Sequence, residues 1–279
     1  MSTDAVIVNH AAWADAAALP RGAMPEGVGL IAVDYRADSS WPGKLRRRAV
    51  RLASRRPARA PSRSMLSFAF DDVPASAAQT GAEILEARGL KATYYVAAAL
   101  AGTNAATGRM ACAQAVQRLS AAGHEIGCHT YSHLDCGRAA ARDAVEDVAL
   151  NAETLAHWGL PRPTTFSYPF GDVAPATKRA LAGRFRLMRA LHPGLVASGS
   201  DLNQAPSVGT EGPEGEALAL RWLSRLAARP AWLILTTHDV AEHPSAWGCT
   251  PATLARLADA ALAAGVEVVT VAEGAARVG

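Results

Sequence analysis

From residue 65 onward, short runs of apolar residues alternate with longer stretches in which apolar residues recur every three or four positions. Runs of the first kind are typical of buried strands, and the longer stretches are typical of amphipathic helices. The predicted strands are 65–70, 92–96, 124–128, 164–168, 185–189, 232–237 and 267–271. The predicted helices are 75–88, 111–122, 138–158, 175–182, 216–228 and 251–264.

Alternating strands and helices indicate parallel strands joined by crossover helices, in a doubly wound sheet or a barrel. Residues 192–215 are rich in Gly, Pro, Ser and Asn, which predicts a long loop between two of these units. Residues 1–64 do not follow the alternation. We therefore expect an N-terminal accessory segment over 1–64 and one α/β domain over 65–279.

The composition excludes several other classes of protein. A chain of 279 residues that is 50% hydrophobic buries a sizeable core and is not wholly disordered. It contains no run of the roughly 20 apolar residues that a membrane-spanning helix needs. Four cysteines without a CxxC pair do not form a disulfide framework, and the first residues do not have the pattern of a signal peptide. The expected location is therefore cytoplasmic.

The net charge of +3 is unevenly distributed, because residues 44–63 contain nine basic residues and no acidic one. The rest of the chain is therefore net negative, which argues against specific binding of nucleic acid. Leu45, Ala49, Leu52 and Ala53 can share one face of a helix in this stretch. We expect either a solvated helix face or a peripheral contact with an anionic membrane surface through residues 44–63.

Polar residues follow the predicted strands, at the edge where parallel α/β folds build active sites. Taken singly, each has an ordinary explanation, such as a turn or a helix cap. Together they supply two carboxylates, three imidazoles and a guanidinium. One carboxylate with two imidazoles is a set that leaves coordination positions open on a catalytic divalent metal. The H-x-x-x-H spacing places both imidazoles on one face of a helical turn. The residues at this edge are Asp71, Asp72, His129, His133, Tyr168, Phe170, Arg189 and His238.

Four motifs in order, AFDDVP, GHEIGCHTYSH, FSYPFG and LILTTHD, resemble those of the polysaccharide deacetylases of the NodB homology type, carbohydrate esterase family 4. The resemblance spans about residues 65–272. It implies a distorted (β/α) barrel of about seven parallel strands. It also implies a hydrolase that removes N-acetyl groups, or O-acetyl groups, from sugars with the help of a divalent metal.

The resemblance assigns roles to the residues that match the motifs. Asp72, His129 and His133 correspond to the metal ligands, Asp71 to the general base and His238 to the general acid. The expected metal is Zn²⁺, with Co²⁺, Mn²⁺ and Ni²⁺ as alternatives.

Three further residues are expected around the substrate. The backbone N–H of Phe170 corresponds to an oxyanion donor, Leu235 to the leucine that lines the pocket for the acetyl methyl, and Tyr168 to a substrate contact. The family's arginine, which orients the catalytic aspartate, is absent, because Ser167 stands two residues before the motif's proline. Arg189, at the end of the next strand, is predicted to supply the missing cation.

Some points stay open from the sequence. Asp201 is a candidate for the acidic residue that pairs with the acid histidine, and Trp232 and Trp247 either stack on a sugar or fill the core. The predicted partner is an N-acetylated oligo- or polysaccharide, with a lipid-linked precursor as one form. The alternatives are an amide, formyl or O-acetyl hydrolase on a lipid- or nucleotide-linked sugar, and a carbohydrate-binding protein that has lost catalysis.

Overall fold

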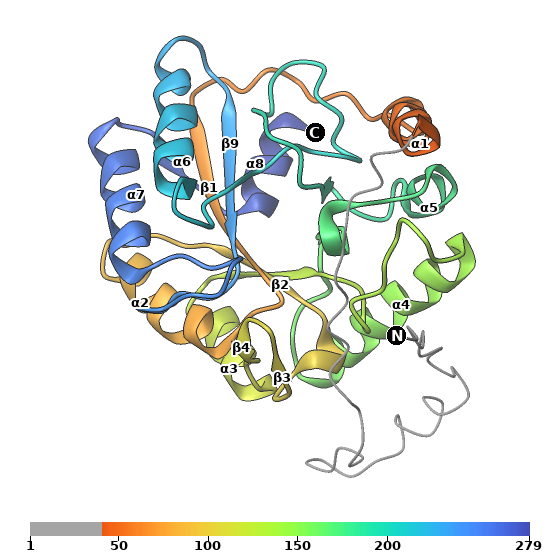
Figure 1. Cartoon of the computed structure of the whole chain (residues 1–279), viewed down its shortest axis with the longest axis horizontal. Helices are drawn as coiled ribbons and strands as arrows, with labels where there is room; N and C mark the ends of the chain where they lie inside the picture. The colour runs from red at the N-terminus through yellow and green to blue at the C-terminus, as the bar shows by residue number, and fades with distance from the viewer. Residues whose placement is uncertain (1–40) are drawn as a thin grey trace. The chain divides into compact units, whose positions relative to one another are not determined.

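The computed structural model describes residues 41–279, which are built around one parallel sheet (Figure 1). The strands are β1 (Met65–Asp71), β2 (Thr93–Val96), β5 (Glu125–Cys128), β6 (Thr165–Ser167), β7 (Leu187–Arg189), β8 (Val208–Gly209), β9 (Trp232–Thr237) and β10 (Glu267–Val268). Seven of them follow one another in the order β7-β6-β5-β2-β1-β9-β8, and β10 pairs with the start of β1.

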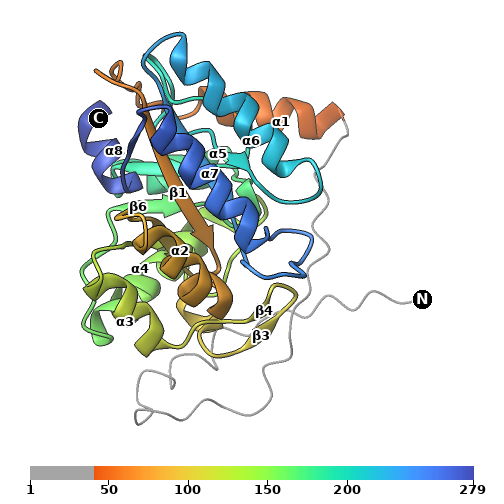
Figure 2. The ribbon, with the colours of Figure 1, turned by 90° about the vertical axis from the view of Figure 1, so that its left-hand side faces the viewer.

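Crossover helices surround this sheet (Figures 1 and 2). They are α2 (Ala82–Glu86), which continues a π-helical turn at Ala77–Gly81, α3 (Ala113–Ala121), α4 (Ala141–His157), α5 (Pro175–Leu181), α6 (Gly215–Ser224) and α7 (Pro251–Ala263). Helix α1 (Trp41–Leu52) precedes the barrel in the chain, and α8 (Val271–Val278) ends it. Three short 3₁₀ turns lie at Ala98–Leu100, Pro169–Gly171 and Arg225–Ala227, and a small hairpin joins β3 (Asn104–Ala105) to β4 (Gly108–Arg109).

The sheet curls until its two edges meet. Arg189, at the end of β7, forms a parallel bridge with Ala205, three residues before β8. The Ala205 N–H donates to the Met188 carbonyl at 2.8 Å, and the Ala190 N–H donates to the Ala205 carbonyl at 2.9 Å. The predicted distorted (β/α) barrel is therefore confirmed.

Alternation along the strands divides the core into an inner and an outer part, because successive side chains point to opposite faces. On β1, Leu66 and Phe68 pack in the outer cluster beneath the helices, whereas Met65 and Ala69 pack in the inner cluster. The inner cluster also contains side chains of α8. Gly274 of this helix has no room for a Cβ, because one would lie 2.4 Å from the Trp232 ring. Helix α8 therefore packs against the barrel interior beside the first residues of β1.

Several short elements were not predicted. Strand β8 and the β3–β4 hairpin have only two residues per strand, which is too short for an alternating pattern to appear. The predicted strand 267–271 ends at Val268, because Thr270 caps α8 in a capping box with Glu273.

The described part of the predicted accessory segment, residues 41–64, packs against the barrel; residues 1–40 lie outside the described chain. Val50 and Ala58 are buried, and the Lys178 ammonium donates to the Val50 carbonyl at 2.8 Å. The sequence predicted one apolar helix face formed by Leu45, Ala49, Leu52 and Ala53. Three of these residues, Leu45, Ala49 and Leu52, are exposed to solvent. None of the described helices is both long and apolar enough to span a membrane.

Candidate active site

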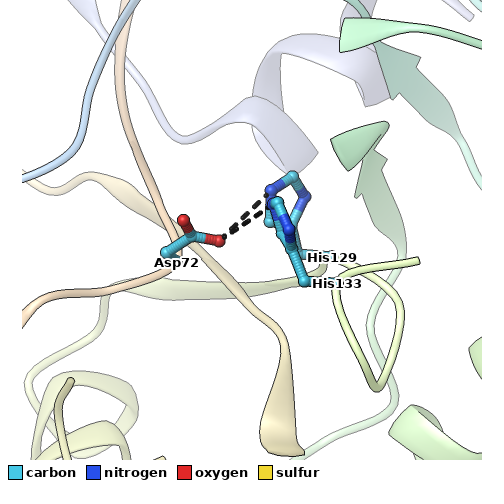
Figure 3. A group of neighbouring side chains, drawn as sticks. All are labelled: Asp72, His129 and His133. Atoms are coloured by element: carbon cyan, nitrogen blue, oxygen red, sulfur yellow. Dashed lines mark ion pairs between the residues drawn. The ribbon is translucent and has the colours of Figure 1, made fainter. Parts of the chain in front are cut away.

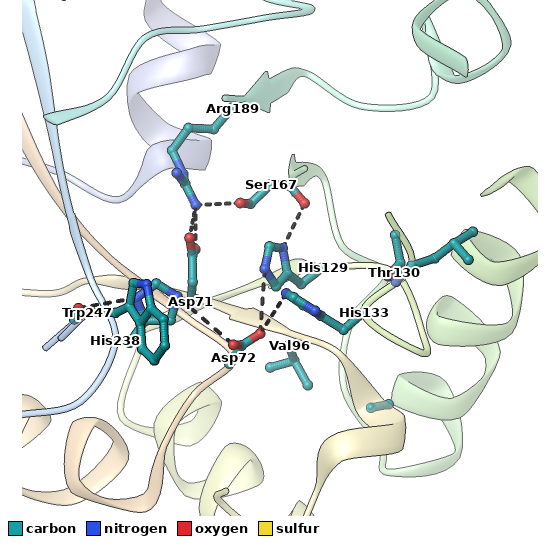
Figure 4. A network of polar contacts seen from close by, with 12 residues as sticks. Asp71, Asp72, Val96, His129, Thr130, His133, Ser167, Arg189, His238 and Trp247 are labelled. Atoms are coloured by element: carbon teal, nitrogen blue, oxygen red, sulfur yellow. Dashed lines mark hydrogen bonds and ion pairs between the residues drawn. The ribbon is translucent and has the colours of Figure 1, made fainter. Parts of the chain in front are cut away.

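The C-terminal ends of five strands bring polar side chains together at one end of the barrel (Figure 4). Asp71 is the last residue of β1, and Asp72 follows it. Ser167 and Arg189 are the last residues of β6 and β7. His129 and His238 directly follow β5 and β9. This is the edge that the sequence predicts, because parallel strands all end on the same side of a sheet.

A carboxylate faces two imidazoles at the centre of this site (Figure 3). The Asp72 Oδ1 atom lies 3.3 Å from His133 Nε2 and 3.6 Å from His129 Nε2. The ligand atoms of the three residues all lie within 4.8 Å of one another. Asp72 Oδ1 is buried and accepts no hydrogen bond in the described structure. A buried oxygen without a donor beside two imidazole nitrogens fits a divalent cation, because it would otherwise stay unsatisfied.

The segment that carries the two histidines is not the helical turn that the H-x-x-x-H spacing predicts. Thr130 and His133 have positive φ values of 61° and 57°, which non-glycine residues adopt rarely. The turn is held by the buried Asp147 of α4, whose Oδ1 accepts the Ser132 N–H at 3.0 Å and whose Oδ2 accepts the Ser132 hydroxyl at 2.8 Å. Backbone strain at a site of this kind is offset by such contacts.

His129 is held in the form that a metal requires. Its Nδ1 donates to the Ser167 carbonyl at 2.8 Å, which leaves the Nε2 lone pair directed toward Asp72. Burial lowers the pKa of His129 to about 4, against the opposing attraction of Asp71. The imidazole is therefore neutral near pH 7.

Arg189 and Asp71 form a buried ion pair, as the sequence suggests. The Arg189 Nη2 donates to both carboxylate oxygens of Asp71 and to the Ser167 hydroxyl, and Nη1 donates to the Ser207 hydroxyl at 3.2 Å. Burial raises the pKa of Asp71, but the attraction of Arg189, with His129 and His238, outweighs it and brings the pKa to about 2. Asp71 is therefore ionised across the neutral range. Its role in catalysis stays a prediction.

His238 lies on the other side of Asp72 from His133 (Figure 4). Its Nδ1 is 3.3 Å from the Trp247 carbonyl oxygen, to which it donates as the Nδ1–H tautomer. Its Nε2 is 4.0 Å from Asp72 Oδ2. The nitrogen that faces the site is therefore available to exchange a proton with a group bound there.

Phe170, the predicted oxyanion donor, adjoins His133. Its φ is 58°, and its ring packs edge-on against His133 with the ring centroids 4.6 Å apart. Gly171 follows with φ at 66° and could not carry a Cβ, which would come within 2.4 Å of Leu191. The donor role of the Phe170 N–H stays a prediction.

The side chains of Tyr168 and Leu235 do not line the site. Tyr168 is buried in the core, and its hydroxyl donates to the Asn203 carbonyl at 3.1 Å. Leu235 packs in the outer cluster, because alternation on β9 gives the barrel face to Ile234 and Thr236. Thr236 therefore has the position predicted for Leu235, and its buried hydroxyl makes no hydrogen bond within the described residues.

The acidic partner expected near His238 is not Asp201. The Asp201 carboxylate pairs with Lys178 at 2.7 Å and accepts the Arg56 N–H at 2.9 Å. Instead Glu211 approaches the site: a Cβ on Gly209 would lie 2.1 Å from the Glu211 carboxylate, so that glycine makes room for it.

Burial raises the pKa of Glu211, and His238, Asp71 and Arg189 are the charges that act on it. Sequence reasoning missed Glu211 because it lies in the glycine-rich loop before α6, outside every matched motif. A carboxylate between two glycines in the loop that leads to α6 is the sequence signal that could have found it.

Residues 58–185 match the family model for polysaccharide deacetylase. A comparison with curated proteins finds no match.

Solved structures support the fold. The chitin deacetylase from Colletotrichum lindemuthianum is 19% identical with a TM-score of 0.55, and the match covers 77% of this chain and 89% of that one. A family 4 carbohydrate esterase from Streptomyces lividans is 18% identical with a TM-score of 0.54, covering 75% and 93%. A family 4 acetyl xylan esterase from Clostridium thermocellum, solved with a cobalt ion, is 19% identical with a TM-score of 0.55, covering 75% and 89%.

The proposed ligands are tested by metal content. We expect Asp72→Ala and His133→Ala to abolish stoichiometric metal in the purified protein, because each removes one of three ligands. Elemental analysis after dialysis measures this. His157→Ala, an exposed histidine on α4 that bonds only its own helix, is the matched control and keeps the metal. Full metal in both ligand variants would contradict the assignment.

The ion pair is tested by exchanging its cation between strands. Arg189→Met leaves a buried carboxylate without a partner and is expected to lower the free energy of unfolding by about 3–5 kcal/mol. The double variant Ser167→Arg with Arg189→Ser returns a guanidinium from the adjacent strand and should recover most of that loss. Urea unfolding monitored by circular dichroism gives both values. No recovery in the double variant would show that the cation must come from β7.

Proposed function

We propose that this chain is a metal-dependent hydrolase that removes N-acetyl groups from an N-acetylated sugar of a polysaccharide or its precursor. The observation that carries the proposal is a carboxylate whose buried oxygen faces two imidazoles, with an ionised carboxylate on one side and an imidazole on the other. The family match supports a deacetylase, and neighbours in the same fold include a chitin deacetylase and a peptidoglycan N-acetylglucosamine deacetylase.

A divalent cation fits the site, with Asp72, His129 and His133 as its ligands and Zn²⁺ as the expected ion. Bound there, it would supply Lewis acidity, which polarises an amide carbonyl and makes water more acidic. Asp72 and the neutral imidazoles supply the donor atoms, and the Ser167 carbonyl fixes the orientation of His129.

The two remaining groups move protons. Asp71 is ionised and held in place by Arg189, so it can accept the proton of an attacking water. An amine leaves poorly unless it is protonated, and the Nε2 of His238, on the far side of Asp72 from His133, is placed to donate that proton. The Phe170 N–H is proposed to stabilise the negative charge on the carbonyl oxygen.

A catalytically silent carbohydrate-binding protein is the alternative, and one neighbouring structure is described as a family 4 pseudoenzyme mutant with restored activity. The buried pair of Asp71 and Arg189 favours the enzyme, because binding alone does not require an ionised carboxylate at this position. Hydrolysis of a formyl or O-acetyl substrate would use the same side chains, so an assay on each substrate distinguishes these activities from N-deacetylation.

If the proposed roles are right, substituting Asp71 or His238 lowers turnover but leaves the metal content unchanged. Asp71→Asn removes the proton acceptor and should lower kcat by about 10²- to 10⁴-fold while the metal is retained. His238→Ala should have the same pattern, because it removes the proton donor. Acetate release from N-acetylglucosamine oligomers measures kcat. Loss of metal from Asp71→Asn would show that Asp71 is a ligand and not the base.

We also propose that α1 contacts an anionic membrane surface. Its outward side carries the exposed Trp41, Leu45 and Leu52, and the exposed Arg48 and Arg51 lie alongside them. Arg46, in contrast, faces the barrel, where it pairs with Asp172 and donates to the Gly137 carbonyl. An apolar stripe flanked by cations is typical of a helix that lies on a charged lipid surface.

Liposome flotation tests this contact. The protein should float with anionic vesicles at low salt and be released at about 0.5 M salt, where the Debye length is about 4 Å. Arg48→Gln with Arg51→Gln should lose most of the binding, since each cation contributes about 1 kcal/mol. Arg162→Gln with Arg229→Gln, two exposed arginines that precede β6 and β9, is the charge-matched control. Equal flotation of both double variants would contradict the proposal.

A further inference from the structure

Trp247 presents a half-exposed indole at the mouth of the barrel, directly beside His238. Its side chain is 48% exposed, and Figure 4 places it on the His238 side of Asp72, across the site from His133. Its carbonyl oxygen accepts the His238 N–H at 3.1 Å and lies 3.3 Å from His238 Nδ1. The same residue therefore orients the proposed acid and exposes a large aromatic surface next to it.

Five of the seven large apolar side chains that are exposed in the part of the chain that the structure describes lie on the outer helices. Trp41, Leu45, Leu52, Leu220 and Leu262 lie on α1, α6 and α7. The remaining two are Trp247 and Leu191, and Leu191 contacts Gly171 beside the predicted oxyanion turn. These two side chains thus adjoin the site on the His238 side and the Phe170 side.

The loop that carries Trp247 is fixed by the buried carboxylate of Asp239. Asp239 accepts the Ser245 N–H at 2.8 Å and the Ser245 hydroxyl at 2.5 Å, and the Ser245 hydroxyl in turn accepts the Trp247 N–H at 3.2 Å. Gly248 has no Cβ because one would lie 2.4 Å from Asp239. The Cys249 N–H donates to the Asp239 carbonyl at 3.0 Å. The indole is therefore preorganised, and binding would cost it little conformational entropy.

We propose that Trp247 is the platform on which the pyranose ring of the substrate stacks, a binding subsite for hexosamine rings. This rests on the proposed deacetylase function, in which His238 protonates the leaving nitrogen. That nitrogen is bonded directly to a ring carbon of the sugar. Trp247, which lies beside His238, therefore faces the sugar ring and not the acetyl methyl. A flat apolar surface with little freedom to move matches the C–H face of a pyranose. Trp232, the other tryptophan singled out in the sequence, is fully buried in the core.

The test compares an acetylated oligosaccharide with an acetamide that has no ring. Acetate release is measured for the N-acetylglucosamine tetramer and for N-acetylethanolamine. Trp247→Ala should lower kcat/KM for the tetramer about tenfold, mainly through KM, since tenfold corresponds to about 1.4 kcal/mol of binding. It should change the ring-free substrate by less than about twofold. Trp247→Phe should recover most of the tetramer value, and Leu262→Ala, an exposed residue at the far end of α7, is the control.

The outcomes separate this inference from the proposed function. Equal losses on both substrates would show that Trp247 only holds His238, and an unchanged tetramer value would overturn the subsite while the deacetylase remains. If the wild type releases no acetate, the proposed deacetylase function is wrong, and the tetramer can still be used as a ligand that is not turned over. Calorimetry on the same proteins then decides the subsite: weaker binding by Trp247→Ala supports it, and equal binding or none overturns it.

Discussion

The buried ion pair between Arg189 and Asp71 joins two strands that are not neighbours in the sheet. Arg189 also lies where the barrel closes, because its neighbours Met188 and Ala190 bond to Ala205 across the closing edge, and its own carbonyl accepts the Tyr168 N–H at 3.0 Å. One residue thus links the closing edge of the sheet, the loop that leads to Phe170 and the carboxylate of β1. A charge removed from such a position would leave its partner buried and uncompensated.

The same pair sets the electrostatics of the site. Asp71 and Asp72 are adjacent in the chain, and two carboxylates this close favour protonation of one of them. Arg189 keeps Asp71 ionised, while burial keeps His129 neutral. Two carboxylates and one guanidinium leave a net negative charge at the site, and the buried Asp72 oxygen nearest the imidazoles has no donor within the described residues. A divalent cation would satisfy both the charge and the oxygen.

Strand periodicity, which is local, predicted parallel strands with polar residues at their ends, and the resemblance of the motifs supplied the barrel and the roles of those residues. The sequence-based prediction placed Leu235 on the wrong face, since a shift of one residue along a strand reverses the side. It also assigned a helical turn to the segment after His129, where the left-handed Thr130 and His133 depend on Asp147, a residue of α4. Glu211 depends on the missing Cβ of Gly209, a contact that no motif encodes.

Ser167 and Arg189 show how a site can keep its charge when a motif residue changes. The two residues are direct cross-strand partners on β6 and β7, and neighbouring strands lie only about 4.8 Å apart. An arginine side chain is longer than that separation, so its guanidinium can reach the same carboxylate from either strand. The small Ser167 leaves room for it and accepts a hydrogen bond from it. What the chemistry constrains is therefore the position of the cation beside Asp71, and the fold allows that position to be filled from two places in the sequence.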